Sequence, residues 1–243
     1  TDYLKRDSFY TGMAEGNINT ERIVAMLNVK DDQLVVEEKG VYTVEKFLVA
    51  RRLMYWQVYL HKTGIVAEQL LIRVLKRAKE LSHSGTELKA SAALSHFLKN
   101  RIDSTTIKMS LDLFAQLDDY DIISAMKEWC SHEDFVLSEL SKCVIQRDLL
   151  KVKIRKKPFK QSKVLEHRKH ISQLHNITEE EAAYFVFTGT ISNQAYNYRK
   201  GGINILLSNG KIIDVVKASD QLSLKSLTKE VVKNYLCYPK VKA

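Results

Sequence analysis

The sequence predicts a mostly α-helical protein that ends in a small α+β lobe, and three observations carry this prediction. Only two prolines and nine glycines occur in 243 residues, which is few for an all-β architecture with its many turns. Apolar side chains recur at helical spacing through much of residues 1–150. After residue 150 the pattern changes to short runs with a period of two, which is typical of strands. We therefore predict a helical segment over 1–150 and an α+β lobe over 151–243.

The composition is that of a folded globular protein. Hydrophobic residues make up 45% and charged residues 28% of the chain, which excludes an intrinsically disordered or collagen-like chain. The net charge of +9 favours anionic partners such as nucleotides, nucleic acid or anionic lipid. Three cysteines without a CxxC arrangement indicate neither a disulfide framework nor a zinc site, and they favour a reducing, cytoplasmic setting. No run of 18 apolar residues occurs, so we expect no membrane partner.

The helical segment divides into a series of predicted helices. The clearest helical period runs over residues 45–62, and a second amphipathic pattern from Ile65 to Leu81 ends at the sequence His83-Ser84-Gly85. Further helical patterns, each entered or left through Asp, Ser or Asn clusters, cover residues 87–98, 111–117, 121–129 and 135–149.

The lobe is expected to combine strands with one final helix. Strands are predicted over residues 151–155, 184–188 and 203–207. The turn Ser208-Asn209-Gly210, followed by an aliphatic run, predicts a hairpin. A last helix is predicted from about Leu224 to Tyr235, with Pro239 just beyond its end.

Two stripes of side chains share the helix predicted over residues 45–62. At about 100° per residue, Arg51, Tyr55, Tyr59 and Lys62 fall in one stripe, immediately beside a core stripe of apolar side chains. Two cations and two phenols on one face suit a polyphosphate, because arginine offers a bidentate fork and lysine a mobile charge. The alternative is that these long side chains merely cover the rim of the core.

A phenol and a carboxylate stand together near the beginning of the chain. Tyr3 and Asp7 are four residues apart on a predicted helix, so they project side by side. Such a pair is suited to holding the face and a hydroxyl of a sugar. By spacing alone, the pair is also what a solvated helix end would show.

Cations crowd into a short stretch of the chain. Eight of them occur in seventeen residues, with only Asp148 opposing: Arg147, Lys151, Lys153, Arg155, Lys156, Lys157, Lys160 and Lys163. This density can bind the phosphates of nucleic acid with a salt-sensitive affinity. It is equally typical of a solvated strand edge, where lysines block aggregation.

Three histidines, His167, His170 and His175, follow this run closely. A metal site there would need further ligands and an enforced geometry. We therefore expect no metal ion at these histidines.

Two blocks of the sequence resemble the HD-domain deoxynucleoside triphosphohydrolases and their bacterial HD-superfamily phosphohydrolase relatives. The first is Asp-Tyr-Leu-Lys-Arg-Asp-Ser-Phe-Tyr-Thr-Gly at residues 2–12, and the second is Ala-Arg-Arg-Leu-Met-Tyr-Trp-Gln-Val-Tyr-Leu-His-Lys at residues 50–62. Residues 147–151 and the last predicted helix also look like the corresponding parts of the family. The resemblance implies that the fold is the C-terminal part of an HD-domain helical bundle followed by a small α+β lobe.

The resemblance also implies a substrate-binding site. The residue matching Tyr3 packs against the deoxyribose, and the one matching Asp7 bonds the sugar 3′-hydroxyl. The residues matching Arg51, Tyr59 and Lys62 face the triphosphate or line the pocket beside it. The stripe argument puts the same three side chains on one helical face for an independent reason.

A nucleotide-regulated allosteric site is implied only in part. Arg22 matches one of the basic residues of that site, and it is our candidate allosteric residue. Glu37 and Glu38 fall where other basic residues would be.

The family uses a divalent metal ion that is bound by a His, a His-Asp doublet and a later Asp. This chain contains no His-Asp dipeptide, so we nominate no catalytic residue and no metal ligand in it, and we expect these residues upstream of Thr1. The resemblance then implies a cytoplasmic, metal-dependent phosphohydrolase that converts deoxynucleoside triphosphates to deoxynucleoside and triphosphate. The 243 residues alone are expected to be inactive.

Partners follow from the same reasoning. We expect a nucleoside triphosphate substrate and a homo-oligomer, either a dimer or a tetramer. Two alternatives remain: a non-catalytic module that binds nucleotide or nucleic acid through residues 147–163, and an oligomerisation scaffold.

Overall fold

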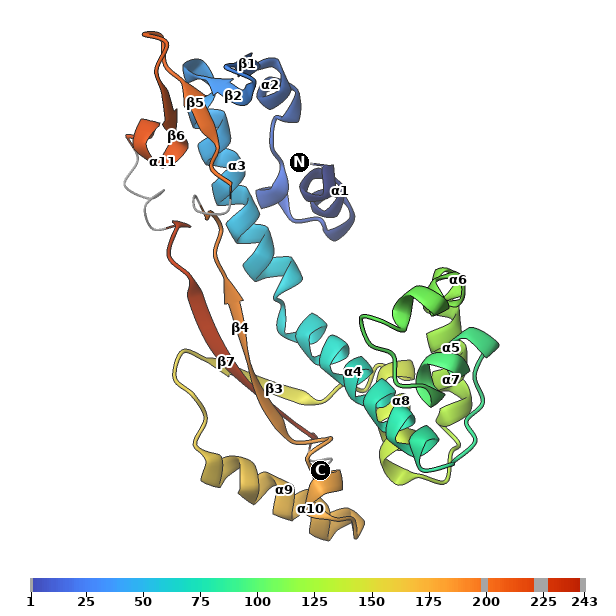
Figure 1. Cartoon of the computed structure of the whole chain (residues 1–243). Helices are drawn as coiled ribbons and strands as arrows, with labels where there is room; N and C mark the ends of the chain where they lie inside the picture. Colours follow the sequence, from blue (N-terminus) through green and yellow to red (C-terminus); the bar gives the residue numbers. More distant parts are fainter. Residues whose placement is uncertain (1, 198–200, 221–226, 241–243) are drawn as a thin grey trace. The chain divides into compact units, whose positions relative to one another are not determined.

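The computed structural model describes residues 2–197, 201–220 and 227–240 (Figure 1). It confirms a mostly helical chain with a smaller α+β portion. Two compact units are present, Thr1–His61 with Thr190–Lys233, and Lys62–Gly189 with Asn234–Ala243. Each unit therefore draws on two separate stretches of the chain, whereas the domain boundary at residue 150 stays a prediction.

The first unit contains α1 (Asp2–Thr11), η1 (Ala14–Gly16), α2 (Thr20–Ala25), β1 (Leu27–Lys30), β2 (Gln33–Glu37), η2 (Glu38–Gly40), α3 (Val41–Met54), η3 (Tyr55–Tyr59), β5 (Asn204–Leu206), β6 (Ile212–Asp214) and α11 (Val215–Ala218). Its sheet has the strand order β1-β2-β5-β6, with β2 and β5 parallel and the other neighbours antiparallel. The core forms where Val36 of β2 and Ile205 of β5 pack with Leu48 of α3.

The hairpin of β1 and β2 is absent from the sequence prediction. Its turn is Asp31-Asp32, and both residues have a positive φ, of 50° and 57°. The strongest sequence signal for such a turn is Asn-Gly or Asp-Gly, which this hairpin lacks. Leu34 and Val29 are also exposed, so the hairpin shows little of the alternation that marks a half-buried strand pair.

Helix α1 is fixed against α3 by a small buried cluster. Leu4 and Met54 are both 0% exposed and pack there with Ile18 and Ala50. Gly16 makes the close approach possible, because a Cβ at that position would lie 2.7 Å from Ser8 Cβ and 3.0 Å from Met54 Sδ. This packing decides where the polar side chains of α1 point.

The second unit contains α4 (Lys62–His83), α5 (Ala92–Lys99), η4 (Ile107–Ser110), α6 (Leu111–Gln116), α7 (Asp119–Trp129), α8 (Phe135–Ile145), β3 (Lys151–Arg155), α9 (Gln161–His175) and α10 (Glu179–Ala182). The unit boundaries fall within β4 (Phe187–Asn193) and β7 (Val231–Tyr238), which join β3 in a sheet of order β3-β7-β4. Along α4, the predicted amphipathic pattern is confirmed, since Leu70, Val74 and Ala78 are each 0% exposed. No described helix combines the length and the apolar character needed to cross a membrane.

Several elements begin or end at residues other than those predicted from the sequence. The helix predicted from residue 87 begins only at Ala92, where the side chain of Ser91 caps it. The helix predicted to run to residue 149 ends at Ile145, and Arg147 has a φ of 58° that a helix does not allow. The strand predicted at 184–188 begins at Phe187.

The predicted final helix is wrong from residue 231 to residue 235. Residues 231–238 form the strand β7, which pairs antiparallel with β3 from Lys151 opposite Tyr238 to Arg155 opposite Asn234. The last four residues of β7 are all buried, as in a strand that is covered on both faces. Burial of this kind removes the period of two that distinguishes a strand from a helix. Residues 224–226 of that prediction lie outside the described part of the chain.

Candidate functional site

Four of the five predicted substrate-binding residues come together in the first unit. The hydroxyl of Tyr59 donates a hydrogen bond of 2.6 Å to Oδ2 of Asp7. The ring centroids of Tyr3 and Tyr59 are 6.1 Å apart. With Arg51 and Tyr55, described next, these side chains form what we call the Tyr59 cluster: Tyr3, Asp7, Arg51, Tyr55 and Tyr59.

A widened turn carries the two phenols of the second sequence block. Residues 55–59 form a π-helical turn, η3, in which the amide of Leu60 donates to the carbonyl of Tyr55 at 2.7 Å. The rings of Tyr55 and Tyr59 then meet edge to face, with centroids 5.1 Å apart. Single π turns inside helices occur frequently at functional sites. The regular helical period used to read the sequence did not foresee this turn.

A hydrogen bond holds one guanidinium nitrogen of Arg51, and the side chain is positively charged throughout the ordinary pH range. Its Nη1 donates to the carbonyl oxygen of the buried residue Ala195, and its guanidinium carbon lies 5.2 Å from the ring centroid of Tyr55. Burial works against the charge, but hydrogen bonds with Tyr3 and Tyr55 outweigh it and raise the pKa of Arg51. A guanidinium has five N–H donors, so the bonds to Ala195, Tyr3 and Tyr55 leave donors for phosphate oxygens.

The hydrogen bond between Tyr59 and Asp7 also fixes the proton on the phenol. Burial, together with the hydrogen bond to Asp7 and the charge of Asp7, raises the pKa of Tyr59. Tyr59 therefore remains a donor at neutral pH. Asp7 accepts that bond through one carboxylate oxygen, and a carboxylate can accept further bonds through the other.

Lys62 belongs to the other compact unit. It is the exposed first residue of α4. The stripe predicted from the sequence is thus shared between the end of the first unit and the beginning of the second. The role of Lys62 toward a triphosphate stays a prediction.

The residues compared with the family's allosteric site differ in charge. Arg22 is exposed on α2, whose N-cap is Asn19. In the same unit, Glu37 and Glu38 line a cavity of about 340 Å³ with Lys39 and residues 206–208. Carboxylates at this cavity oppose an anionic effector. An allosteric role for Arg22 stays a prediction.

The basic run lies on and around an edge strand. Along β3, the side chains of Lys151, Lys153 and Arg155 are exposed while the intervening residues are half-buried. Lys153 Nζ lies 5.6 Å from the ring centroid of Tyr238, and the guanidinium carbon of Arg155 lies 3.9 Å from that of Phe159. These contacts within the chain favour the solvated-edge interpretation of the run.

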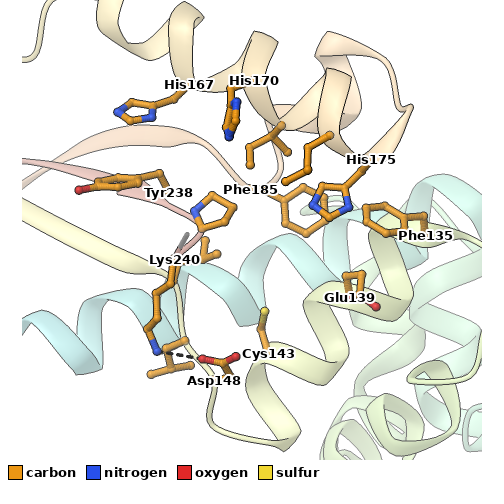
Figure 2. A pocket seen from close by; sticks show the side chains of 15 residues that line it. Phe135, Glu139, Cys143, Asp148, His167, His170, His175, Phe185, Tyr238 and Lys240 are labelled. Atoms are coloured by element: carbon orange, nitrogen blue, oxygen red, sulfur yellow. Dashed lines mark hydrogen bonds and ion pairs between the residues drawn. The ribbon is translucent and has the colours of Figure 1, made fainter. Parts of the chain in front are cut away.

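The described residues do not fit a metal site. In the part of the chain that the structure describes, no group of three or more His, Cys, Asp or Glu side chains is placed to hold a metal ion. His167, His170 and His175 instead face a cavity together with aromatic side chains (Figure 2). Sequence reasoning weighed these histidines only as metal ligands and missed the cavity.

Comparisons with known proteins match this chain to a region of longer proteins. Residues 18–96 match a family model described as the HD associated region. The crystal structure of a phosphohydrolase from Bacteroides thetaiotaomicron superposes with a TM-score of 0.92 at 49% identity, covering 98% of this chain and 60% of that chain. A hypothetical protein from Aquifex aeolicus matches with a TM-score of 0.57 at 24% identity over 98% of this chain and 52% of its own, which shows a shared fold alone.

Among curated relatives, the uncharacterized protein YwfO of Bacillus subtilis is 28% identical over 225 residues, which is 90% of this chain and 50% of that protein. The uncharacterized protein MJ1154 of Methanocaldococcus jannaschii is 27% identical over 144 residues, which is 53% of this chain and 31% of that protein. This chain therefore spans half or less of the length of these curated relatives.

Proposed function

We propose that this chain, which is related to a region of HD phosphohydrolases, supplies the sugar- and phosphate-binding residues of a metal-dependent enzyme that hydrolyses deoxynucleoside triphosphates to deoxynucleoside and triphosphate. The observation that carries the proposal is the hydrogen bond between Tyr59 and Asp7. It joins the two sequence blocks that resemble the family, and Tyr59 contacts Tyr55, whose ring lies beside Arg51.

The sugar end of the site is formed by Tyr3, Asp7 and Tyr59. Tyr3 is 36% exposed, so part of the residue is accessible to a ligand. A deoxyribose packs against the ring of Tyr3, and its 3′-hydroxyl donates to the carboxylate of Asp7. Tyr59 holds this carboxylate in position by donating to Oδ2. Discrimination between sugars then depends on the shape of the space beside Tyr3 and on whether each hydroxyl finds a partner.

The phosphate end is formed by Arg51. Its anchor on the carbonyl of Ala195 fixes the direction of the guanidinium, which lowers the entropy that is lost on binding a phosphate. This charge acts by holding phosphate oxygens.

Metal chemistry belongs to other residues in this proposal. The described residues do not fit a divalent ion, so the ion of the intact enzyme is held outside them. For the same reason we propose that the 243 residues by themselves bind nucleotide but do not hydrolyse it.

The experiment assays the whole protein against a panel of deoxynucleoside and ribonucleoside triphosphates with several divalent ions. Asp7→Ala and Arg51→Ala are expected to lower kcat/KM by roughly ten-fold to a hundred-fold, which corresponds to about 1.5–3 kcal/mol for a hydrogen bond to a charged group. Asp2→Ala and Lys46→Ala are matched controls, because each removes an exposed charge from the same helix, α1 or α3. Unchanged rates in both Asp7→Ala and Arg51→Ala would refute the proposed site.

The homo-oligomer and the nucleic-acid contact remain proposals beside this one. Light scattering over a range of concentrations tests the first, and a result of monomer only rejects it. Oligonucleotide binding at increasing salt tests the second, and neutralising Lys151, Lys153 and Arg155 must then weaken the binding while Arg51→Ala leaves it unchanged.

A further inference from the structure

The second unit contains a cavity of about 540 Å³ that the proposed function does not use (Figure 2). It lies between α8, α9 and the end of β7, and its floor includes the buried side chains of Ile171 and Phe185. Its volume is in the range of roughly 300–1,000 Å³ that is typical of sites for small molecules.

Side chains that recur at helical spacing on two helices line the cavity. On α8, Phe135, Glu139 and Cys143 follow one another at intervals of four, so they form a single stripe that faces the cavity. On α9, the lining residues follow the i, i+3, i+4, i+7 pattern and therefore occupy one face of that helix: His167, His170, Ile171, Leu174 and His175. Leu174 is 63% exposed although it is apolar, which leaves an uncovered apolar side chain at the cavity.

Aromatic rings stand at both ends of the cavity. At one end, the imidazole of His167 stacks on Tyr238 with centroids 4.6 Å apart and an interplanar angle of 20°. At the other end, Phe135 lies 5.0 Å from His175 and 5.9 Å from Phe185, measured between ring centroids. Figure 2 shows these two groups of rings with the cavity between them. Flat faces of this kind favour a planar aromatic ligand.

The charges around the cavity are matched in pairs. Lys240 Nζ lies 2.9 Å from Asp148 Oδ1, and Lys142 Nζ lies 2.7 Å from Glu139 Oε1. Burial and the nearby charge of Lys163 lower the pKa of His167, so this imidazole is neutral at physiological pH. A strongly charged ligand would therefore find no uncompensated partner among these groups.

Hydrogen-bonding capacity comes from imidazole edges. The two ring nitrogens of an imidazole can form hydrogen bonds, and His170 and His175 are both exposed on the face of α9 that lines the cavity. A ligand that complements them presents a donor and an acceptor on its own edge.

From these features we infer that the cavity is a binding site for an uncharged aromatic heterocycle with hydrogen-bond donors and acceptors on its edge, the chemistry of a free nucleobase. The rings stack on the ligand, the aliphatic floor covers it, and the imidazoles contact its polar edge. The site is separate from the Tyr59 cluster, which lies in the other compact unit.

The test titrates adenine into the 243-residue chain and follows binding by calorimetry and by ligand-observed NMR. Leu174→Trp fills the cavity from its open side and is expected to weaken adenine binding at least ten-fold. Leu165→Trp is the matched control, because Leu165 is a leucine of the same helix that is 45% exposed and does not line the cavity. His175→Ala removes a ring and a hydrogen-bonding edge, and it is expected to weaken binding at least five-fold.

Benzoate tests the charge argument, since it is planar but anionic. It is expected to bind at least five-fold more weakly than adenine. Absence of adenine binding, equal binding by the Leu174→Trp and Leu165→Trp variants, or tighter binding of benzoate than of adenine would each overturn the inference.

A second measurement needs no substitution in the cavity. Cys143 lines the cavity, so adenine is expected to slow the alkylation of its thiol by iodoacetamide at least three-fold. A Cys130→Ser background removes the other half-buried cysteine from the measurement. If saturating adenine leaves the rate at Cys143 unchanged, no ligand occupies this cavity and the inference fails.

Discussion

Tyr59 and Asp7 are separated by 52 residues in the chain, yet the phenol of one donates a 2.6 Å hydrogen bond to the carboxylate of the other. The contact exists because α1 packs on α3 through Leu4 and Met54, with Gly16 allowing the approach. A change to either Asp7 or Tyr59 therefore disturbs this contact.

This coupling can be measured as a free energy. A double-mutant cycle of Asp7→Ala and Tyr59→Phe, followed by urea unfolding at pH 7, is expected to give an interaction of about 1 kcal/mol between the two side chains. The value is at the lower end for a charged hydrogen bond because both side chains are only half-buried. Strict additivity of the two single changes would show that the contact does not stabilise the fold.

The same pair makes stability depend on pH in the alkaline range. Because the pKa of Tyr59 is raised in the folded state, its contribution is complete below the ordinary phenol pKa near 10 and falls as the pH rises above it. The stability advantage of the unaltered protein over Tyr59→Phe is therefore expected to shrink between pH 9 and pH 11, as measured by urea unfolding. An advantage that grows over this interval would contradict the assignment.

Two glycines differ in the space available to a side chain. Gly16→Ala is expected to destabilise the protein by about 1–3 kcal/mol, because the new Cβ would meet Ser8 Cβ at 2.7 Å. Gly64 is the matched control: it lies in α4, and a Cβ there meets no atom within 4 Å. Gly64→Ala is expected to be neutral or to stabilise by up to about 1 kcal/mol. Thermal unfolding distinguishes the two, and equal effects would disprove the packing argument.

Arg77 and Asp134 form a two-point ion pair in the second unit. Arg77 Nε and Nη2 contact the two carboxylate oxygens at 3.1 and 2.5 Å, and the side chains are only 18% and 14% exposed. Asp134 also caps α8 by accepting from the amide of Leu137. Removing Arg77 leaves the charge of Asp134 half-buried and unpaired with Arg77. Arg77→Met is therefore expected to lower the free energy of unfolding by about 2–4 kcal/mol at pH 7.

This pair also predicts a loss of stability in acid. Burial alone would raise the pKa of Asp134, but hydrogen bonds from Arg77 and Leu137 outweigh it and lower the pKa. The stabilisation is therefore complete above the ordinary aspartate pKa near 4 and is lost as the pH falls below it. Asp134→Asn keeps a capping oxygen without the charge, and its stability deficit is expected to narrow from pH 7 to pH 3. A constant deficit would exclude the ion pair as its source.

Cys237 is expected to be unreactive in the folded protein. It is 0% exposed within β7, and burial raises the pKa of its thiol to about 12. Alkylation by iodoacetamide at pH 8, followed by mass spectrometry, should therefore label Cys237 at least a hundred-fold more slowly than in guanidinium. Equal labelling rates in the folded and the unfolded protein would show that β7 does not hold this residue in the core.

Much of the secondary structure follows from local patterns. The helical spacing of Leu70, Val74 and Ala78 predicts α4, and the alternation over residues 151–155 predicts β3. The turn at Asn209-Gly210 marks the hairpin of β5 and β6, where Gly210 has a φ of 80°. These signals succeed because each depends on neighbours within one turn or one strand.

The two missed elements have separate physical causes. Strand β7 is read as a helix from the sequence, because a strand that is buried on both faces shows no alternation. Its pairing with β3 involves partners about eighty positions away in the chain. The hairpin of β1 and β2 was not predicted because its turn has two aspartates at positive φ in place of glycine.

The sequence by itself determined the helical class and most of the elements, and it predicted a set of sugar- and phosphate-binding residues, because periodicity and residue chemistry are local properties. Only the tertiary structure decided that Asp7 meets Tyr59, that Arg51 is anchored on Ala195, and that three histidines share a cavity with aromatic rings. Contacts of this kind arise from the packing of elements that are distant in the chain, and a local pattern carries no record of which elements will pack together.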